Sequence, residues 1–329
     1  MTTDMASEAL SELTCRAAAD LANQHRRGPR PTVAAAIISN GQVSAQCAGG
    51  AGFDISTPVE LGSLTKPMTG TLLGSAIVER EARDVTTLGE VFELDGPAAA
   101  ITLGALATHR SGLPRLPPPI ARRWPQSSDD PYASISSADL LRALRRVRLG
   151  PSRYVYSNFG YMILGLALET ISGETYGSLL ESRVTVPLAM EGTILIDHST
   201  HLPSGLSGKG RPRRSWTMGV NGAGGVAASI TDLVKYVAAH LNPPQGRPGA
   251  AIRLASMEQA CEPPMGYGWH YFGNVAWHNG MTAGFQSFAA FHRPSHTATV
   301  ILANSGVNAG LDRLAMRSLF VASGETPPE

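Results

Sequence analysis

The sequence predicts an α/β (α+β) fold in which one antiparallel sheet is flanked by N- and C-terminal helices and carries an inserted α-rich subdomain. Two observations predict this class. Short apolar runs of strand length occur near both ends of the chain, and the middle third has the 3.6-residue periodicity of helices. We expect a single domain over residues 1–329, with an α/β part at 1–62 and 225–329 and a helical part at 63–224.

The N-terminal third begins with an alanine-rich amphipathic pattern over residues 1–30, which predicts a helix. Two apolar runs follow, Thr32–Ser39 and Gln42–Cys47. They are joined by Asn40-Gly41, a dipeptide typical of two-residue hairpin turns because both turn positions need positive φ. A helical pattern then runs from Leu64 to about Arg80. We therefore expect a helix, a hairpin and a second helix.

The middle third is predicted to be mostly helical. Four segments have the helical spacing of apolar residues: Thr102–Arg110, Ser136–Val147, Phe159–Ser172 and Glu174–Val184. The Pro-rich loop Leu113–Pro119 and the pair Gly150-Pro151 interrupt them, because proline and glycine end helices. These segments form the expected inserted subdomain.

The C-terminal third returns to strand patterns. A polar loop, His198–Arg214, precedes a predicted helix over Ile230–Leu241. Three strands and a closing helix are then predicted, at Asn274–His278, Phe285–Arg293, Thr297–Asn304 and Leu311–Ala322. Pairing of these strands with the N-terminal hairpin would complete one sheet. The cleft between that sheet and the helical part is the expected site.

Composition excludes several classes of protein. The formal net charge is +1 and its charges are scattered, so the one-faced basic field of a nucleic-acid-binding protein is missing. No segment is long and apolar enough to span a bilayer, so we expect no membrane association. Glu8, Glu12 and Asp20 interrupt the apolar middle that a signal sequence would have, which favours a cytoplasmic protein. The sequence does not indicate an oligomeric state.

Cysteine usage gives a further expectation. Cys15, Cys47 and Cys261 are odd in number and far apart in the chain. That pattern argues against a disulfide framework and fits a reducing compartment. We expect all three to be buried as small apolar residues.

Lysine is rare, since only three of the 27 basic residues are lysines. One of them, Lys66, stands three residues after Ser63 in Ser63-Leu64-Thr65-Lys66. Residues three apart share a helix face, so a neutral Lys66 amine is placed to accept the Ser63 proton. Arginine cannot do this, because guanidinium keeps its proton, and the lysine needs burial or a nearby cation to lower its pKa. A Ser-x-x-Lys pair also occurs by accident, so it does not identify a site alone.

A second candidate is Tyr156-Ser157-Asn158, directly before the helix predicted from Phe159. A tyrosine beside a lysine can relay a proton to a leaving group, and the Asn158 amide can orient a substrate carbonyl. The alternative is structural: Tyr156 would be a core residue, and Ser157 or Asn158 would cap the helix.

A third candidate is His278-Asn279-Gly280-Met281, at the end of a predicted strand. Glycine in a strand permits close backbone approach, so the N-H of Met281 would be able to face a ligand oxygen. The alternative is a solvated or capped His278 and a bulge at Gly280.

These three ordered motifs, Ser-x-x-Lys, Tyr-x-Asn and His-x-Gly, resemble those of the serine β-lactamase and penicillin-binding (DD-peptidase) superfamily, of the class C type. The stretches Ala107–Pro114, Gly224–Asp232 and Gly280–Phe285 are also similar to that family, so the likeness covers about residues 34–304. His109, in the first stretch, is expected to pack or hydrogen-bond structurally within its loop.

The resemblance implies roles for the matching residues. Ser63 would be the acylated nucleophile, Lys66 and Tyr156 the general base and acid pair, and Asn158 a hydrogen-bond donor to substrate. The backbone N-H groups of Ser63 and Met281 would form the oxyanion hole.

The third motif departs from the pattern of many relatives, because His278 stands where they have a lysine. Imidazole near neutral pH is only partly cationic, so we expect a weaker dependence on a substrate carboxylate. That departure makes β-lactam hydrolysis less expected. The resemblance still implies that His278, Gly280 and Met281 are substrate-binding residues.

No metal or cofactor is expected. Asp197, His198 and His201 lack further ligands at fixed spacing, and Gly222–Gly225 has neither phosphate-loop nor dinucleotide spacing. The basic run Lys209–Arg214 is expected to be solvated, with recognition of an anionic substrate as the alternative.

The expected function is that of a serine hydrolase or acyltransferase, an esterase, amidase or transacylase that forms an acyl-Ser63 intermediate from a small-molecule ester or amide. One alternative is a β-lactamase or D-Ala-D-Ala peptidase acting on a lactam or peptide. The other is a non-catalytic binding protein that retains the fold, although intact Ser63, Lys66 and Tyr156 favour an enzyme.

Overall fold

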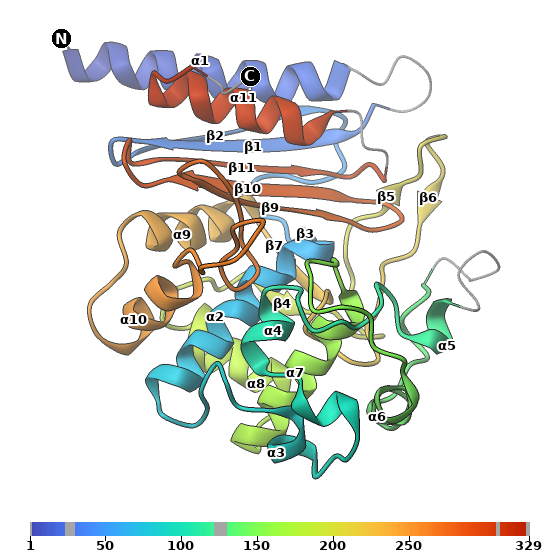
Figure 1. Ribbon diagram of the computed structural model, residues 1–329. Helices are drawn as coiled ribbons and strands as arrows, with labels where there is room; N and C mark the ends of the chain where they lie inside the picture. The colour runs from blue at the N-terminus through green and yellow to red at the C-terminus, as the bar shows by residue number, and fades with distance from the viewer. Residues whose placement is uncertain (1, 24–29, 122–129, 307–309, 327–329) are drawn as a thin grey trace.

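The computed structural model describes residues 2–23, 30–121, 130–306 and 310–326. One layer is a six-stranded antiparallel sheet in the order β2-β1-β11-β10-β9-β8 (Figure 1). Its strands are β1 (Thr32–Ser39), β2 (Gln42–Gly49), β8 (His270–Phe272), β9 (Val275–Met281), β10 (Gln286–His292) and β11 (Thr297–Ala303). Because β1 pairs with β11, the prediction of one sheet built from both ends of the chain is confirmed.

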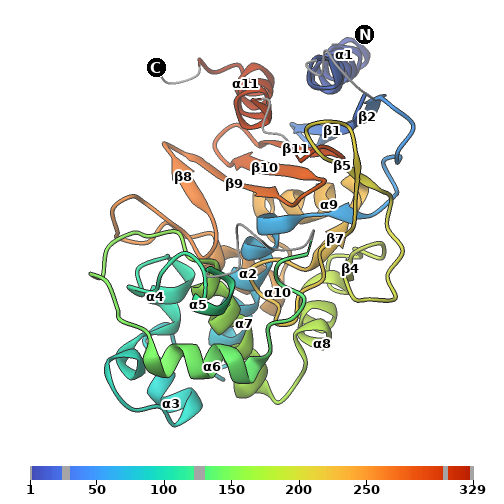
Figure 2. The same ribbon diagram turned by 90° about the vertical axis from the view of Figure 1, so that its right-hand side faces the viewer.

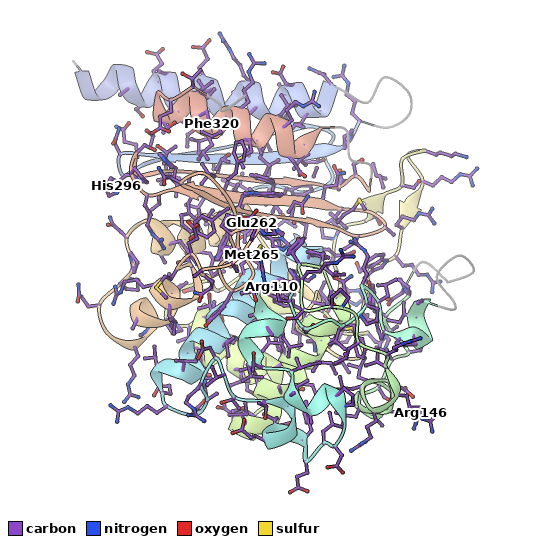
Figure 3. The ribbon with its side chains drawn as sticks, in the orientation of Figure 1. Arg110, Arg146, Glu262, Met265, His296 and Phe320 are labelled. Atoms are coloured by element: carbon purple, nitrogen blue, oxygen red, sulfur yellow. The ribbon has the colours of Figure 1, made fainter. Side chains whose placement is uncertain are left out.

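Two helices, α1 (Thr2–Asn23) and α11 (Leu311–Ser323), lie side by side on one face of this sheet (Figures 1 and 2). Alternation along β10 divides the core: Phe288 packs in the cluster under these helices, whereas Phe291 belongs to the larger core on the other face. Phe320 of α11, labelled in Figure 3, is buried in the cluster under these helices. Burial on both faces explains why β10 reads as a nearly continuous apolar run.

The helical region covers the other face. At its centre α2 (Thr65–Val78) is buried on nearly all sides and packs against α7 (Asn158–Ser172) and α10 (Gly246–Ala255), while α9 (Ile230–Leu241) lies against β10 and β11. The shorter elements are α3 (Leu88–Phe92), α4 (Leu103–Ala107), α5 (Pro118–Ala121), α6 (Ser137–Arg146) and α8 (Tyr176–Leu180), with 3-10 turns η1 (Gly62–Leu64) and η2 (Pro97–Ala100) and a π-turn, η4 (Glu181–Thr185). Within the described ranges no helix combines the length and apolar character needed to cross a membrane.

Two small sheets complete the fold. One contains β3 (Val59–Glu60), β7 (Val226–Ala228) and β4 (Ile194–Leu195), and the other pairs β5 (Gly205–Leu206) with β6 (Pro212–Arg213). The first joins the segment that enters the helical region to the segment that leaves it. The predicted division of the chain at residues 62/63 and 224/225 stays a prediction.

Local capping sets the helix ends more tightly than the apolar pattern does. Ser136 caps α6 in a reciprocal capping box with Asp139. The helix predicted over Thr102–Arg110 is shorter, because Thr102 is its cap and His109 has a φ of 59°. The segment predicted as Glu174–Val184 is divided into α8 and the π-turn.

Several elements differ from the sequence prediction. The short elements α3 and β8 and the helix α10 were not predicted, and the polar loop His198–Arg214 contains the β5–β6 hairpin. The strand predicted to end at His278 continues to Met281 because Gly280 pairs with Ser287. The first helix ends at Asn23 in the described chain, and the remainder of its predicted range includes residues 24–29, outside the described residues.

The prediction that the cysteines are buried is wrong. Cys15 and Cys47 are exposed, and Cys261 is half-buried. Cys47 lies on β2, the edge strand, whose neighbour Ala48 packs in the core under α1 and α11 while Cys47 points to the opposite face. Free thiols at these positions therefore contact solvent.

Candidate active site

Ser63 lies where the sheet meets the helical region, in the 3-10 turn between β3 and α2. The residue before this turn, Leu61, donates its N-H to the carbonyl of Val226 (3.0 Å). Its own carbonyl accepts a hydrogen bond from the Ser287 hydroxyl (2.7 Å). The nucleophile candidate is thus tied to both β7 and β10.

Two glycines let β9 lie against this turn. A Cβ at Gly280 would be 1.9 Å from the Leu61 carbonyl oxygen, and a Cβ at Gly62 would lie 2.8 to 3.0 Å from backbone atoms of Met281. Gly62 also has a φ of 52°, in the left-handed region. The predicted close backbone approach at Gly280 is confirmed, and it brings the Met281 backbone beside the turn that carries Ser63.

Lys66 is fully buried, with its amine directed at the nucleophile candidate. Its Nζ lies 3.0 Å from the Oγ of Ser63 and donates a hydrogen bond to the carbonyl of Ala223 (2.8 Å). Among the described residues no carboxylate forms a salt bridge with it. Burial lowers the pKa of Lys66 well below its ordinary value, and the Arg115 cation lowers it further. The amine is therefore poised as a neutral base.

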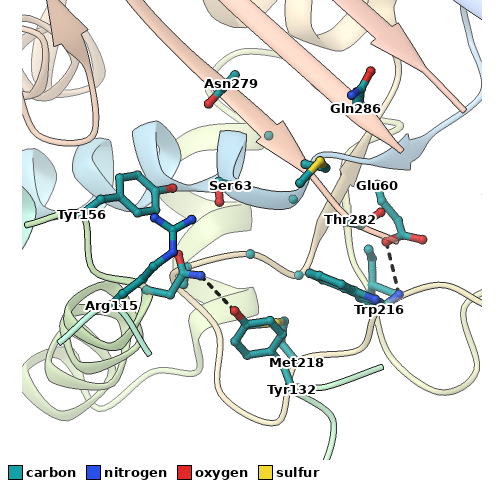
Figure 4. A pocket seen from close by; sticks show the side chains of 18 of the residues that line it. Glu60, Ser63, Arg115, Tyr132, Tyr156, Trp216, Met218, Asn279, Thr282 and Gln286 are labelled. Carbon is teal, nitrogen blue, oxygen red and sulfur yellow. Dashed lines mark hydrogen bonds between the residues drawn. The ribbon is translucent and has the colours of Figure 1, made fainter. Parts of the chain in front are cut away.

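Tyr156 supplies the second titratable group beside Ser63. The Nζ of Lys66 lies 4.9 Å from the centre of its ring, and the guanidinium carbon of Arg115 lies 5.1 Å from that centre. Figure 4 shows Arg115 and Tyr156 beside Ser63. Burial raises the pKa of Tyr156, with Ser63 and Arg115 offsetting only part of the effect. The phenol therefore keeps its proton and is suited to donate it.

The Tyr-x-Asn turn is held by a histidine. His109, fully buried, accepts the N-H of Ser157 at its Nδ1 (3.1 Å), and the Ser157 hydroxyl caps α7 by accepting the N-H of Gly160 (2.9 Å). The helix cap that was the structural alternative for Ser157 is present, and His109 hydrogen-bonds structurally as expected, although its bond reaches outside its own loop. The Asn158 amide donates to the Tyr132 hydroxyl (2.9 Å), and its buried Oδ1 accepts nothing from the described residues.

His278 is buried and neutral. Its Nδ1 donates to the carbonyl of Asn279 (2.5 Å), so its Nε2 carries the lone pair. Burial lowers the pKa of His278 well below its ordinary value, and His270, whose ring centre is 5.0 Å away, and Lys66 lower it further. The partly cationic imidazole that the sequence suggested is therefore uncharged here, and its role in substrate binding stays a prediction.

These groups surround a cavity of about 560 Å³. Its walls include five predicted site residues: Ser63, Tyr156, Asn158, Gly280 and Met281. Other lining residues were not anticipated, among them Glu60, Arg115, Tyr132, Trp216, His270 and Gln286. Arg115 directly follows the Ala107–Pro114 stretch, so its nearness to that stretch was the sequence signal that could have found it. His270 has no motif beside it.

The acidic residues of the cavity have partners of their own. Glu60 accepts the backbone N-H of Trp216 (3.2 Å, Figure 4), and burial raises the pKa of its carboxyl group to about 7. Asp312 of α11 accepts a hydrogen bond from the Asn279 side-chain amide (2.6 Å). Both carboxyl groups of the cavity wall are therefore engaged by the protein.

The residues weighed as metal ligands have other surroundings. The Asp197 carboxylate accepts hydrogen bonds from the hydroxyls of Ser199 (2.7 Å) and Thr200 (2.9 Å), as in a polar turn. In the part of the chain that the structure describes, no group of three or more histidine, cysteine or acidic residues is arranged to hold a metal ion. In the basic run, Lys209 and Arg211 are exposed on the β5–β6 hairpin.

Ser63, Lys66 and Tyr156 thus meet between an antiparallel sheet and a helical region. The chain belongs to the Beta-lactamase family, whose family model matches residues 17–322. The predicted family resemblance, and with it the prediction of a serine enzyme of this type, is confirmed at the level of the family.

Two comparisons place the chain among known proteins. The fold is similar to that of a class C β-lactamase from Rhodobacter sphaeroides, with a TM-score of 0.81 and 19% identity over 94% of this chain and 99% of that one. The fold is also similar to that of a β-lactamase from Sulfitobacter sp. EE-36, with a TM-score of 0.82 and 20% identity over 96% of this chain and 98% of that one.

Among curated proteins, the D-alanyl-D-alanine-carboxypeptidase/endopeptidase AmpH of Escherichia coli (strain K12) is 28% identical over 209 residues, 57% of this chain and 50% of AmpH. The chain thus spans about half the length of this relative.

Proposed function

We propose that the protein is a serine hydrolase or acyltransferase that forms an acyl-enzyme at Ser63 from a small-molecule ester or amide. The observation that carries this proposal is the buried, neutral Lys66 amine 3.0 Å from the Ser63 hydroxyl. A nucleophile paired with a buried, uncharged base is the arrangement that covalent acyl transfer requires.

Acylation uses the groups in sequence. The Ser63 oxygen attacks the substrate carbonyl carbon while its proton moves to the lone pair of Lys66, and the carbonyl oxygen becomes an oxyanion. Backbone N-H groups of Ser63 and Met281 would hold that charge, a contribution on the order of 3 kcal/mol per donor. The bond to the leaving group then breaks, the leaving atom takes the phenolic proton of Tyr156, and the Lys66 ammonium restores that proton.

Deacylation repeats these steps with another nucleophile. Water, an amine or an alcohol loses its proton to Lys66 and attacks the acyl carbon, and the Ser63 oxygen leaves with a proton from Tyr156. Asn158 lines the cavity beside the substrate, and its buried Oδ1 accepts no hydrogen bond from the described residues. The proposed activity includes esterase, amidase and transacylase chemistry, because each uses this cycle.

The proposal is tested by intact-protein mass spectrometry after incubation with a fluorophosphonate, an activated aryl ester and a penicillin. We expect a covalent adduct from the first two that is absent in Ser63→Ala. Absence of every adduct, while a control serine hydrolase is labelled under the same conditions, would contradict acyl-enzyme formation.

The test also separates the alternatives. A penicillin adduct that hydrolyses with turnover would favour a β-lactamase, and release of D-alanine from a D-Ala-D-Ala peptide would favour a peptidase. Equal ester turnover by the wild type and Ser63→Ala would favour a binding protein with the same fold. Neutral His278, in place of a lysine, favours the ester or amide substrate over the lactam.

A further inference from the structure

The cavity contains a positive charge at an unexpected place. Of the described residues that line it, Arg115 alone carries a fixed positive charge. The position on β9 where many relatives have lysine holds His278, which is neutral because it is buried beside His270 and Lys66. In this chain the cation at the cavity therefore comes from the loop before α5 and not from the sheet.

The Arg115 guanidinium has no anionic partner within the described residues. Its side-chain contact is the Tyr156 ring, and it is exposed to the cavity. Arg183, in contrast, lies 2.7 Å from the Glu81 carboxylate. The cavity's own carboxyl groups at Glu60 and Asp312 already accept hydrogen bonds from Trp216 and Asn279.

The backbone fixes Arg115 close to the proposed chemistry. Its carbonyl accepts the N-H of Asn158 (2.9 Å) and of Phe159 (3.3 Å), which joins the arginine to the start of α7. Figure 4 places its guanidinium beside Tyr156 and across the cavity from Asn279 of β9. An anion held there would lie on the Asn158 side of Ser63.

We propose that the substrate carries a carboxylate on the part held beside Asn158, and that Arg115 selects it. The planar guanidinium fork matches a carboxylate in a bidentate pair, and such charge-assisted hydrogen bonds are among the strongest in proteins. This inference rests on the proposed function and specifies its substrate class: an anionic ester or amide whose acid group is a few bonds from the scissile carbonyl.

Substrate charge would also act on the base. The Arg115 cation contributes to the low pKa of Lys66, so a bound carboxylate that neutralises Arg115 would make Lys66 a stronger base. The correct substrate would then improve the proton acceptor that attacks it.

The experiment compares two activated esters of equal chain length, p-nitrophenyl valerate and p-nitrophenyl hemiglutarate, which differ by a terminal carboxylate. We expect kcat/KM to favour the anionic ester in the wild type. In Arg115→Gln the ratio of anionic to neutral kcat/KM should fall about ten- to a hundredfold, and Arg115→Glu should lower it further. An unchanged ratio in Arg115→Gln would overturn the inference.

A matched control removes a positive charge elsewhere. Lys209→Gln lies on the exposed basic run at the β5–β6 hairpin and should leave the ratio unchanged. A fall in the ratio equal to that of Arg115→Gln would move recognition to this run and would contradict the assignment to Arg115.

Direct binding keeps this inference separate from the acyl-enzyme proposal. In Ser63→Ala, glutarate binding is followed by the fluorescence of the cavity tryptophans, Trp216 and Trp277. We expect at least about tenfold weaker binding when Arg115→Gln is added. If glutarate binding depends on Arg115 but no ester adduct forms, this inference stands and the acyl-enzyme proposal is contradicted. If the adduct forms but glutarate binding does not depend on Arg115 and the ester ratio is unchanged, the acyl-enzyme proposal stands and this inference is contradicted.

Discussion

The environment of Lys66 explains why arginine, abundant in this chain, does not occupy that position. Its amine lies among two tyrosine rings, a backbone carbonyl and the Ser63 hydroxyl, with no described carboxylate to hold a charge. A permanent cation would be costly there. Position 66 therefore requires a titratable base and not a permanent positive charge.

Replacing Lys66 tests this distinction. We expect Lys66→Arg to lose nearly as much esterase kcat/KM as Lys66→Ala, about a hundredfold or more, because guanidinium cannot accept the Ser63 proton. Circular dichroism would control for folding. An arginine variant that keeps a substantial fraction of the activity would show that charge alone is needed.

The pH dependence follows from the same amine. Its neutral form accepts the proton, so kcat/KM for a neutral ester should rise with pH through the lowered pKa of Lys66 and level off above it. In Arg115→Gln the neighbouring cation is lost, so this limb should move to higher pH. An unmoved limb would mean that the titrating group is not near Arg115.

At the scale of elements, glycines at the meeting of β9 and η1 set the geometry of the oxyanion hole. Gly280→Ala would place a methyl group 1.9 Å from the Leu61 carbonyl and push the Met281 N-H away from Ser63. We expect fluorophosphonate labelling to slow by about two orders of magnitude. In Gly177→Ala, whose new Cβ would make only ordinary contacts with Leu195 at 3.5 Å and Thr175 at 3.9 Å, labelling should not change. Normal labelling of folded Gly280→Ala would contradict the proposed hole.

How far the sequence predicts these elements depends on the range of the signal. The Asn40-Gly41 turn and the apolar runs beside it were local signals, and they predicted β1 with its observed bounds. For the six-stranded sheet, the sequence predicted only that strands from both ends of the chain pair with one another. The helix α10 was missed because it begins with Gly246-Arg247-Pro248-Gly249, residues typical of a turn, and is stabilised by packing against α2.

The candidate site divides in the same way. The sequence predicted Ser63, Lys66 and Tyr156 together, and the structure brings them into contact distance; their catalytic roles stay predictions. The charge of His278 depends on burial by distant elements, which no local pattern reports. Arg115 follows Pro114 in a loop, and its place beside the Tyr156 ring, with no anionic partner among the described residues, is a feature that only the three-dimensional structure gives.

For the whole molecule, Glu60 makes stability depend on pH. Burial raises the pKa of its carboxyl group to about 7, so the folded state binds this proton more tightly than the unfolded state. Its contribution to stability should therefore fall as pH rises from about 4.5 to about 7 and stay low above that range.

Glu60→Gln removes this dependence. We expect the variant to be more stable than the wild type at pH 8, by at most about 3 kcal/mol, with the difference disappearing near pH 4. Urea unfolding at both pH values measures this. The exposed Glu12→Gln on α1 is the control, and a Glu60→Gln difference of equal size at both pH values would refute the assignment.

The attachment of the Ser63 turn to β7, β9 and β10 has a consequence for how the enzyme would respond to its own intermediate. The turn is tied by hydrogen bonds to β7 and β10, and the buried helix α2 continues from it through the centre of the helical region. An acyl group on Ser63 would lie against β9, so opening of the sheet would break the contacts that this group makes there. The amide hydrogens of β9 and β10 should accordingly exchange more slowly in the acylated molecule than in the free enzyme. Acylation of the Ser63 oxygen would then reduce local opening of the whole sheet.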